Sequence, residues 1–377
     1  PIFIFNEDNI KGDYIYIISA AYDYHNVEVK KIINEKYKYY YYHDFIDQHY
    51  HGVRIGVSGT HGKTTTTRML SHFLDEGNIC SIIGDGEGIG TKNYDYFLFE
   101  ACEYKNNFLH LNYDYLIINN IDFDHPDFFP DLQTTIKSFQ KVANKSKVII
   151  INGDDENCQK IIHPHKYTFG KSVNNDLYYI VEEVLEKGYK VKIFFKNEEH
   201  RYYLPFLGEH MIYNFLSSLL AYYLLQKNFN IQEKLITYKN PRRRMEEYYY
   251  YTNIIIDDYA HHPTEIKACL KGIKLKYPDK KIIVFFEPHT YTRTLALGES
   301  FLNAFHDIDE LYLAKTFTSK REKYSRVLEK EVIKMFPKAQ RYNIGLLKKI
   351  KNYENTVIVF MGAGNIRKNI KTILNYT

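Results

Sequence analysis

The sequence predicts an α/β protein in which short apolar strands alternate with helices in two successive regions. Apolar runs and helical periodicity alternate over residues 53–151 and again over residues 253–360, which is the pattern of mostly parallel sheets. The chain has 377 residues, more than a single hydrophobic core usually supports. A glycine-rich stretch over residues 56–62 follows the first strand of the first region. We therefore expect two α/β domains, with the glycine-rich turn at the carboxyl edge of the first sheet.

The individual elements follow from the apolar runs and from the residues that interrupt them. Residues 13–45 are expected to form strand, helix and strand, a unit too short to be a domain alone. In the first region we expect strands at 53–58, 79–83, 95–99, 114–118 and 147–151 and helices at 63–76, 133–143 and 211–226. In the second region we expect strands at 253–257, 281–286, 310–314 and 356–360 and helices at 263–276 and 297–305. An antiparallel insertion is expected over 177–204, and Pro241 with its charged neighbours indicates a linker. The predicted organisation is a partial N-terminal α/β unit (1–50), a central domain (51–240) and a C-terminal domain (241–377).

Composition argues against several classes of function. The net charge is +4 with both signs mixed along the chain, so nothing indicates a protein that binds nucleic acid. The four cysteines have no metal-ligand spacing and are expected to be free thiols in a reducing cytoplasm. No run of the sequence is apolar enough to cross a membrane, and we expect no signal peptide. We therefore expect a cytoplasmic monomer or homodimer that acts on small molecules.

Residues 56–67 carry the strongest functional signal of the chain. They read Gly-Val-Ser-Gly-Thr-His-Gly-Lys-Thr-Thr-Thr-Thr and follow a strand. Gly59 and Gly62 let backbone N–H groups approach phosphate oxygens, and the N-terminus of the following helix adds its dipole. Lys63 is expected to reach the terminal phosphates and the Thr64 hydroxyl to bind Mg²⁺. The central region is thus predicted to be a P-loop domain with a mostly parallel sheet. The alternative is a glycine-rich turn before an ordinary helix. Four threonines at the start of the helix argue against it, because threonine has a low helix propensity.

Two strands downstream of this loop end in side chains suited to the same site. Glu100 follows the strand at 95–99, and His125 lies in the polar segment after the strand at 114–118. Ligands of open α/β sheets lie outside the carboxyl ends of the strands, so both side chains are expected to face the bound phosphates. A carboxylate suits Mg²⁺, whereas a lone Glu after a strand is often only a helix cap. Their placement after successive strands favours the metal site.

The C-terminal region, predicted to be a Rossmann-like α/β domain, has two further polar junctions between strand and helix. The first reads Asp-Asp-Tyr-Ala-His-His-Pro-Thr-Glu over residues 257–265, where acids and histidines are costly unless they bind a ligand or are well solvated. Asp258 is a candidate there, with helix capping as the alternative. The second junction contains Arg293, which either clamps a carboxylate in bidentate fashion or is an ordinary surface arginine.

Together these motifs resemble those of the Mur ligase family of peptidoglycan synthesis. They occur in the family's order, and the resemblance extends over residues 13–377. The segments that carry it are Gly59-Thr-His-Gly-Lys-Thr-Thr-Thr, Glu100-Ala-Cys-Glu103, Asn120-Ile-Asp-Phe-Asp-His125, Gly208-Glu-His210-Met-Ile-Tyr-Asn214, Asp257-Asp-Tyr-Ala-His-His-Pro-Thr-Glu265 and Pro288-His-Thr-Tyr-Thr-Arg293. The last segment is more similar to the family's alanine-adding members than to its muropeptide-recycling members.

The resemblance implies an ATP-dependent ligase that joins L-alanine to UDP-N-acetylmuramic acid through an acyl phosphate. It implies that Lys63 stabilises the transferring phosphoryl group, that Thr64 and Glu100 hold Mg²⁺, and that His125 holds a second Mg²⁺. The implied ATP contacts are Gly59, Thr60, His61, Gly62, Lys63, Thr64, Thr65, His210, Asn214, Arg243 or Arg244, and Asp258. The implied contacts of the amino acid and acyl phosphate are His262, His289 and Arg293. A ligand held between two domains predicts hinge closure.

The sequence departs from the family's pattern at its start and at three motif positions. The first strand and glycine-rich turn of the family's UDP-binding domain have no counterpart, so residues 1–50 are expected to be part of that domain in a cropped or truncated chain. Cys102, Met211 and Thr290 replace an Asp, an Asn and an Arg of the family's motifs. Loss of this arginine removes an expected contact with a carboxylate, which is worth about 1.5–3 kcal/mol as a charged hydrogen bond. Two alternatives therefore stand: a nucleotide-binding protein that does not ligate, and a ligase with other substrates, such as a muropeptide or another amino acid.

Overall fold

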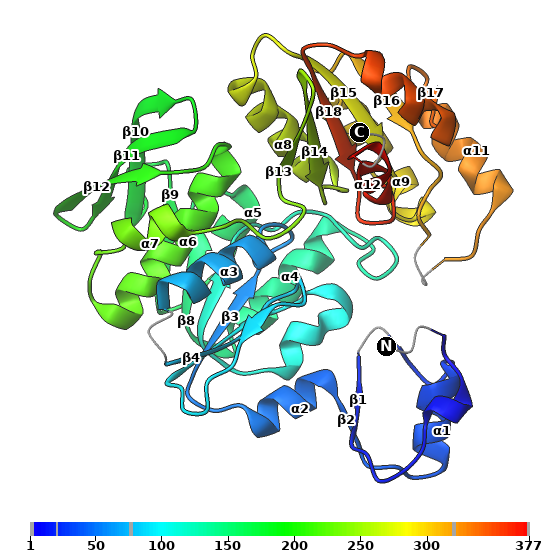
Figure 1. Ribbon diagram of the computed structural model, residues 1–377. Coiled ribbons are helices and arrows are strands. Elements are labelled where there is room, and N and C mark those ends of the chain that lie inside the picture. Colours follow the sequence, from blue (N-terminus) through cyan, green and yellow to red (C-terminus); the bar gives the residue numbers. More distant parts are fainter. Residues whose placement is uncertain (1–3, 20–21, 75–77, 319–321, 375–377) are drawn as a thin grey trace.

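Two large sheets organise the chain in the computed structural model, which describes residues 4–19, 22–74, 78–318 and 322–374. Within these ranges, a ten-stranded sheet forms the central domain and a six-stranded sheet forms the C-terminal domain. A small N-terminal unit with a two-stranded sheet lies apart from the C-terminal domain, beside the central domain (Figure 1).

The central sheet is parallel in its middle and antiparallel at one end. Its strand order is β12-β11-β10-β9-β8-β7-β3-β6-β4-β5. The strands are β3 (Val53–Ser58), β4 (Ile79–Ile82), β5 (Gly88–Ile89), β6 (Tyr96–Glu100), β7 (Tyr113–Ile118), β8 (Ser146–Asn152), β9 (Lys166–Gly170), β10 (Leu177–Leu185), β11 (Gly188–Phe195) and β12 (Glu198–Leu204). Because β3 pairs in parallel with β7 on one side and with β6 on the other, the segments that follow these three strands meet at one edge of the sheet.

Helices cover both faces of the central sheet. They are α3 (Lys63–Leu74), α4 (Leu132–Ala143), α5 (Glu156–Gln159), α6 (Glu209–Gln226), α7 (Gln232–Thr237) and the 3₁₀ segment η2 (Tyr104–His110). The side chains of Ile55 and Val57 pack with α3 and α6 in one apolar cluster. The side chains of Phe97 and Phe99 pack with α4 in a second cluster on the other face. The strands are apolar on both faces for this reason, as parallel sheets between helices are.

The C-terminal sheet has the order β13-β14-β18-β15-β16-β17, with only β13 antiparallel to its neighbour. The strands are β13 (Glu246–Tyr250), β14 (Asn253–Asp258), β15 (Lys281–Phe286), β16 (Glu310–Leu313), β17 (Gln340–Arg341) and β18 (Thr356–Met361). The helices are α8 (Pro263–Lys276), α9 (Tyr291–Ala296), α10 (Gly298–Ala304), α11 (Arg326–Met335), α12 (Lys368–Leu374) and the 3₁₀ segment η3 (Ile344–Asn352). Pro263 occupies the first turn of α8, as its fixed φ favours.

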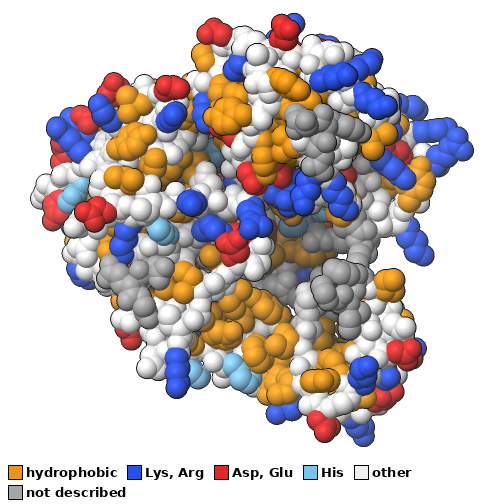
Figure 2. Space-filling model, in the orientation of Figure 1, with side chains coloured by type: hydrophobic (Ala, Val, Ile, Leu, Met, Phe, Trp, Pro, Cys, Tyr) orange, Lys and Arg blue, Asp and Glu red, His pale blue; other side chains and the backbone are white. Residues whose placement is uncertain are grey.

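The N-terminal unit is small and exposes apolar side chains. It contains η1 (Glu7–Asn9), β1 (Tyr16–Ile18), α1 (Val27–Asn34) and β2 (Tyr39–Tyr41), and α2 (Tyr42–His49) leads to the central domain. Its buried core consists of Ile10, Ile18, Val29 and Ile32. Ile15 and Ile17 are about half exposed, and Figure 2 shows several apolar side chains on the surface of this unit, at the lower right.

The predicted fold class is confirmed, and each predicted strand of the two large sheets lies within one residue of its expected bounds. The antiparallel insertion extends the central sheet as β10–β12 and was expected without its neighbour β9. The edge strands β5, β13 and β17 and the helices α7, α9, α11 and α12 were not predicted, because they are short or carry charged and tyrosine-rich sequences. The last residues of the helix expected over 63–76 lie outside the described residues.

In the part of the chain that the structure describes, every helix is too short or too polar to span a lipid bilayer.

Candidate active site

The glycine-rich loop lies between β3 and α3, at the carboxyl edge of the central sheet. Gly59 has φ +125° and Gly62 has φ +80°, conformations that residues with a Cβ rarely adopt. A Cβ at Gly59 would also lie 3.0 Å from the backbone nitrogen of Asn119. The turn therefore needs glycine at both positions, and it leads directly into the N-terminus of α3, whose first N–H groups have no intrahelical partner.

The segment after β7 fixes the conformation of this loop. The Thr60 N–H donates to the Asn120 carbonyl at 3.1 Å, and the His61 N–H donates to Asn120 Oδ1 at 2.8 Å. The Thr60 hydroxyl accepts the N–H of Asp122 at 2.8 Å. Thr65 follows in the first turn of α3 and lines the cavity described below. The polar groups of Thr60 thus shape the loop in this structure.

The Lys63 ammonium is bound by the loop and by an acid that follows β6. Its Nζ donates to the carbonyls of Gly59 at 2.6 Å and Thr60 at 3.1 Å, and to the Glu103 carboxylate oxygens at 2.9 and 3.1 Å. Burial favours the neutral amine, but the Glu103 charge outweighs it and raises the pKa of Lys63. Burial likewise opposes ionisation of Glu103, but Lys63 and then His125 outweigh it and lower the pKa of Glu103 to about 2. Lys63 is therefore held as a cation with Glu103 as its counter-charge.

Glu100, at the end of β6, lies beside Thr64 at the start of α3. The Thr64 hydroxyl hydrogen-bonds the Glu100 carboxylate, and the Gly84 N–H donates to Glu100 Oε1 at 2.6 Å. Burial raises the pKa of Glu100 against these two hydrogen bonds. A hydroxyl and a carboxylate next to a phosphate-binding loop are the hard oxygen ligands that Mg²⁺ prefers, so these residues fit a magnesium site.

His125 lies on the other side of Glu103. Its Nε2 is 3.6 Å from Glu103 Oε1, and its ring centroid is 4.6 Å from that of Tyr104. Its Nδ1 is buried without a hydrogen-bond partner among the described residues. The structure thus brings Lys63, Glu100 and His125, which were predicted from separate motifs, to the same edge of the sheet.

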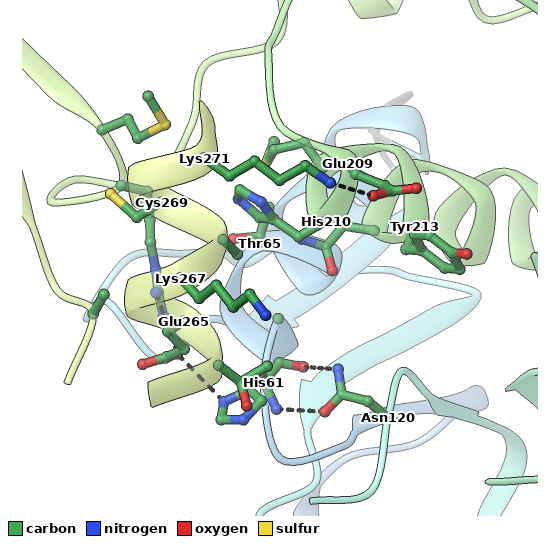
Figure 3. Close-up of a pocket in the computed structure, with 18 of the residues that line it drawn as sticks. His61, Thr65, Asn120, Glu209, His210, Tyr213, Glu265, Lys267, Cys269 and Lys271 are labelled. Atoms are coloured by element: carbon green, nitrogen blue, oxygen red, sulfur yellow. Dashed lines mark hydrogen bonds and ion pairs between the residues drawn. The ribbon is translucent and has the colours of Figure 1, made fainter. Parts of the chain in front are cut away.

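A cavity of about 1210 Å³ opens beside the loop, between the central and C-terminal domains. In Figure 3, α8 with Glu265, Lys267 and Lys271 faces the loop and the first turn of α6 across this cavity. The predicted site residues that line it are His61, Gly62, Thr65, His210, Asn214, Arg244 and Asp258. Its size and its mixture of apolar and polar groups suit a nucleotide.

The start of α6 supplies the side of the cavity expected to bind the base. His210 Nδ1 is buried and has no hydrogen-bond partner in the described part of the chain. Burial and then the charge of Arg244 lower the pKa of His210 to about 4, so its ring is neutral near pH 7. The Asn214 side-chain oxygen accepts a hydrogen bond from the Thr66 hydroxyl at 3.3 Å and lies against Gly62. An unpaired acceptor or donor on a neutral ring is suited to a ligand atom.

Of the two linker arginines, Arg244 lines the cavity and Arg243 does not. Arg244 Nη1 is 3.5 Å from Glu265 Oε1, whereas Arg243 donates to the carbonyls of Gly362 and its neighbour inside the C-terminal domain. The geometry therefore favours Arg244 over Arg243 as the ATP contact. Asp258 lines the cavity too, and its carboxylate accepts the backbone N–H groups of Met245 and Ala260 at 2.8 Å. It does not cap α8, because the residue that does so is His262.

His61 connects the loop to α8. Its Nε2 is 3.5 Å from Asp122 Oδ2, and its Nδ1 is 3.6 Å from Glu265 Oε1. Burial disfavours the imidazolium, but the nearby carboxylates of Asp122 and Glu265 outweigh it and raise the pKa of His61 to about 9. His61 is therefore a cation between an acid of the central domain and an acid of the C-terminal domain.

His262 lies against His61 but is bonded differently. Its Nδ1 accepts the N–H of Thr264 at 3.3 Å and caps α8, while its Nε2 is 3.2 Å from the Phe123 carbonyl. Burial and the nearby His61 charge lower the pKa of His262 to about 4. The ligand atoms of His61, Asp122 and His262 lie within 4.8 Å of one another, but both ring nitrogens of His262 already have hydrogen-bond partners. The three residues therefore form a polar junction between the domains, in which Asp122 Oδ2 is 3.5 Å from His61 Nε2 and 3.8 Å from His262 Nδ1.

Arg293 is bonded across the same seam. Its Nε and Nη2 donate to the two carboxylate oxygens of Asp124 at 2.7 and 3.1 Å, and its Nη1 is 2.8 Å from His289 Nδ1. The predicted carboxylate clamp is thus present, but the carboxylate belongs to the central domain. This arrangement does not match the expected contact of Arg293 with substrate, because all three guanidinium nitrogens face protein groups.

The acids that hold the site together were not predicted as site residues. Glu103, Asp124 and Glu265 pair with Lys63, Arg293 and His61 respectively. All three lie inside the motifs quoted above, so membership of a motif was the sequence signal that could have identified them as site residues. Their partners lie far away in the sequence, so the pairing appears only in the folded chain.

Two segments of the chain match domains of a single family. Residues 57–222 match the Mur ligase middle domain, and residues 243–364 match the Mur ligase glutamate ligase domain. These segments contain the P-loop, the polar segment after β7, the start of α6 and the two C-terminal junctions.

Solved structures have the same fold at low sequence identity. The UDP-N-acetylmuramate–alanine ligase of Thermotoga maritima is 22% identical, with a TM-score of 0.81 over 99% of this chain and 87% of that chain. The murein peptide ligase of Psychrobacter arcticus is 18% identical, with a TM-score of 0.69 over 96% of this chain and 85% of that chain. The MurF ligase of Thermotoga maritima, solved in complex with ADP, is 15% identical, with a TM-score of 0.72 over 99% of this chain and 96% of that chain. The two domain matches, together with the geometry of the P-loop site, show that the chain belongs to the Mur ligase family of ATP-dependent ligases.

Proposed function

We propose that this protein joins the amine of L-alanine to the lactyl carboxylate of UDP-N-acetylmuramic acid, using ATP. The observation that carries the proposal is the meeting of Lys63, Glu100 and His125 at one sheet edge, beside a cavity that two domains enclose. Two points support this member of the family. The segment that ends at Arg293 is more similar to the alanine-adding ligases, and the fold is similar to that of an alanine ligase.

The proposed reaction has two steps. A carboxylate oxygen of the sugar acid attacks the γ-phosphorus of ATP, the bond to the β–γ bridging oxygen breaks, and ADP and an acyl phosphate form. The amine then attacks the acyl carbon, inorganic phosphate leaves, and the nitrogen loses a proton as the amide forms. Lys63 supports the first step by donating to the phosphoryl oxygens where negative charge develops. To do so it exchanges its contact with Glu103 for a contact with phosphate.

The same edge of the sheet fits Mg²⁺. Thr64 and Glu100 would hold it through oxygen atoms, and His125 would hold a second ion. Bound Mg²⁺ neutralises phosphate charge and orients the nucleotide. Glu103 lies between Lys63 and His125 and so orients both side chains toward the phosphate site.

The base of ATP would bind at the start of α6. The unpaired Nδ1 of His210 and the amide of Asn214 face the cavity there. Arg244 lies on the C-terminal side of the same cavity, so closure of the two domains would bring it to the nucleotide.

Phosphate release by the purified protein tests the proposal. ATP turnover should require both UDP-N-acetylmuramic acid and L-alanine, and mass spectrometry should find the amide product. A reaction mixture without the amine and one without the sugar acid are the controls. If the protein binds ATP but releases no phosphate with any pair of sugar acid and amine, it is instead a nucleotide-binding protein that does not ligate.

Thr290 supports a second candidate, a ligase of the same type with other substrates. It replaces an arginine of the family's motif, and it has φ +64°, a conformation that β-branched residues rarely adopt. A neutral side chain at this position removes one charge that would bind a substrate carboxylate. A panel of amino acids and muropeptides separates the two candidates, because clear preference for L-alanine with the UDP-sugar acid excludes the second.

A further inference from the structure

The segment Asp122–His125 belongs to the central domain but is bonded to the C-terminal domain along its length. The Thr264 hydroxyl donates to Asp122 Oδ2 at 2.7 Å. The His262 ring is 3.2 Å from the Phe123 carbonyl. Arg293 binds the Asp124 carboxylate in bidentate fashion. The C-terminal domain thus contacts every residue of this segment that precedes His125.

The contact between Arg293 and Asp124 is the strongest of these. The two side chains are only 5% and 9% exposed, so water screens their attraction little. The paired N–H donors of the guanidinium match both carboxylate oxygens, which fixes the direction of the carboxylate as well as its position. The third guanidinium nitrogen contacts His289, which holds the plane of Arg293 in turn.

Asp124 in turn fixes the backbone of His125. Its Oδ1 accepts the His125 N–H at 2.6 Å, and His125 has φ +55°. Residues with a Cβ adopt this left-handed conformation uncommonly, although histidine does so more often than most, and a hydrogen bond to the N–H stabilises it here. The carboxylate that Arg293 orients is therefore the group that holds the turn, and the turn directs the imidazole toward Glu103, 3.6 Å away.

We propose that Arg293 is a positioning residue that, through Asp124, holds His125 in the orientation needed at the metal–nucleotide site. The site on the central domain is then complete only when the C-terminal domain is docked against it. This proposal rests on the metal-binding role of His125 given above. It replaces the expected contact of Arg293 with substrate.

Binding of Mn²⁺ in the presence of a non-hydrolysable ATP analogue, followed by electron paramagnetic resonance, tests this proposal without turnover. Arg293→Gln is expected to raise the Kd for Mn²⁺ by about 10- to 100-fold, as loss of a residue that orients a metal ligand typically does. Asp124→Asn should have a similar effect, and the double variant should be no worse than either, because both act through one contact.

The double variant Asp124→Asn/Arg293→Gln also guards against failure to fold, since it leaves no unpaired buried charge. Arg341→Gln is the matched control, because it removes an arginine ion pair, with Glu329, that involves neither Asp124 nor His125, and it should leave Mn²⁺ binding unchanged. Folding of all variants is checked by thermal unfolding.

Three outcomes decide between the alternatives. The proposal is overturned if the folded Arg293→Gln variant, or the folded double variant, binds Mn²⁺ as tightly as the wild type. It is also overturned if the only effect of these variants is a higher KM for the sugar acid. A wild-type protein that binds Mn²⁺ and analogue but does not ligate leaves the proposal standing while the proposed function fails. A wild-type protein that binds no Mn²⁺ with the analogue overturns the role of His125 and this proposal with it.

Discussion

The two halves of the seam between the central and C-terminal domains are built in opposite ways. In the half expected to bind phosphate, three charged groups have a charged protein partner: Lys63 with Glu103, Arg293 with Asp124, and His61 with Glu265. In the half expected to bind the base, a cavity of about 1210 Å³ separates the walls, which the ion pair of Lys271 with Glu209 bridges. His210 Nδ1 is buried there without a partner among the described residues.

The difference indicates how the two halves bind a ligand. In the phosphate half the protein's own acids hold the cations in place, so a nucleotide binds there by exchanging one anion for another, and little rearrangement is needed. In the base half the Nδ1 atom of His210 has no partner among the described residues, so its contact with a ligand is added rather than exchanged. Changes at the charge pairs of the phosphate half should therefore alter stability and turnover together, while a change at His210 in the base half should alter nucleotide affinity alone.

Lys63→Met provides the largest test of the phosphate half. It removes the donor to the transferring phosphoryl group, so turnover should fall by at least about 100-fold. It also leaves the Glu103 carboxylate buried, at 3% exposure, without its cation, which should lower the free energy of unfolding by about 3–5 kcal/mol. Phosphate release and urea unfolding measure the two effects.

The double variant Lys63→Met/Glu103→Gln separates these effects. It has no unpaired buried charge, so its stability should return close to that of the wild type, while its turnover stays low. A double variant that recovers turnover would show that the loop does not serve phosphoryl transfer.

The pH dependence of stability tests the His61 junction. The pKa of His61 is raised from 6.5 to about 9 in the folded protein, so its contribution is fully present below pH 6.5 and is lost as the pH rises through 9. This contribution is on the order of 3 kcal/mol. Urea unfolding of wild type and His61→Gln at pH 6.5 and pH 9.5 measures it. Wild type should lose more stability than the variant over this range, and parallel losses would show that His61 is not the titrating group.

The sequence predicted the parts of this site that lie in one short segment. The loop over residues 59–65 could be identified because its glycines, lysine and threonines are adjacent, and their geometry follows from a strand–turn–helix connection. Glu100 and His125 could be placed because parallel strands end at a common edge. The strands themselves were predicted well because they are buried on both faces and therefore apolar throughout.

The charged partners could not be predicted in the same way. Asp124 and Arg293 are 169 residues apart in the sequence and meet only because the two domains are docked. A bidentate arginine was expected from its chemistry, but whether its carboxylate belongs to a substrate or to the protein depends on the tertiary structure. The capping of α8 by His262 was likewise hidden, because a histidine before a proline is compatible with both a ligand contact and a cap.

Glu100→Gln tests the metal side of the phosphate half. It keeps the shape of the side chain and removes its charge, so the Mg²⁺ concentration for half-maximal turnover should rise by about 10- to 100-fold. Stability should change little, because burial already opposes the charge of Glu100. A Mg²⁺ titration of phosphate release measures the effect, and an unchanged titration curve would remove Glu100 from the metal site.

His210→Ala tests the base half and should have the smallest effect. The variant loses one hydrogen bond from a neutral ring to the nucleotide, worth about 1 kcal/mol, so the KM for ATP should rise several-fold while kcat stays near its wild-type value. His306→Ala is the control, because that histidine is 86% exposed and does not line the cavity. If His210→Ala instead lowers kcat as strongly as Lys63→Met, the two halves of the seam do not act separately. The nucleotide would then have to reach the reactive geometry through its base as much as through its phosphates.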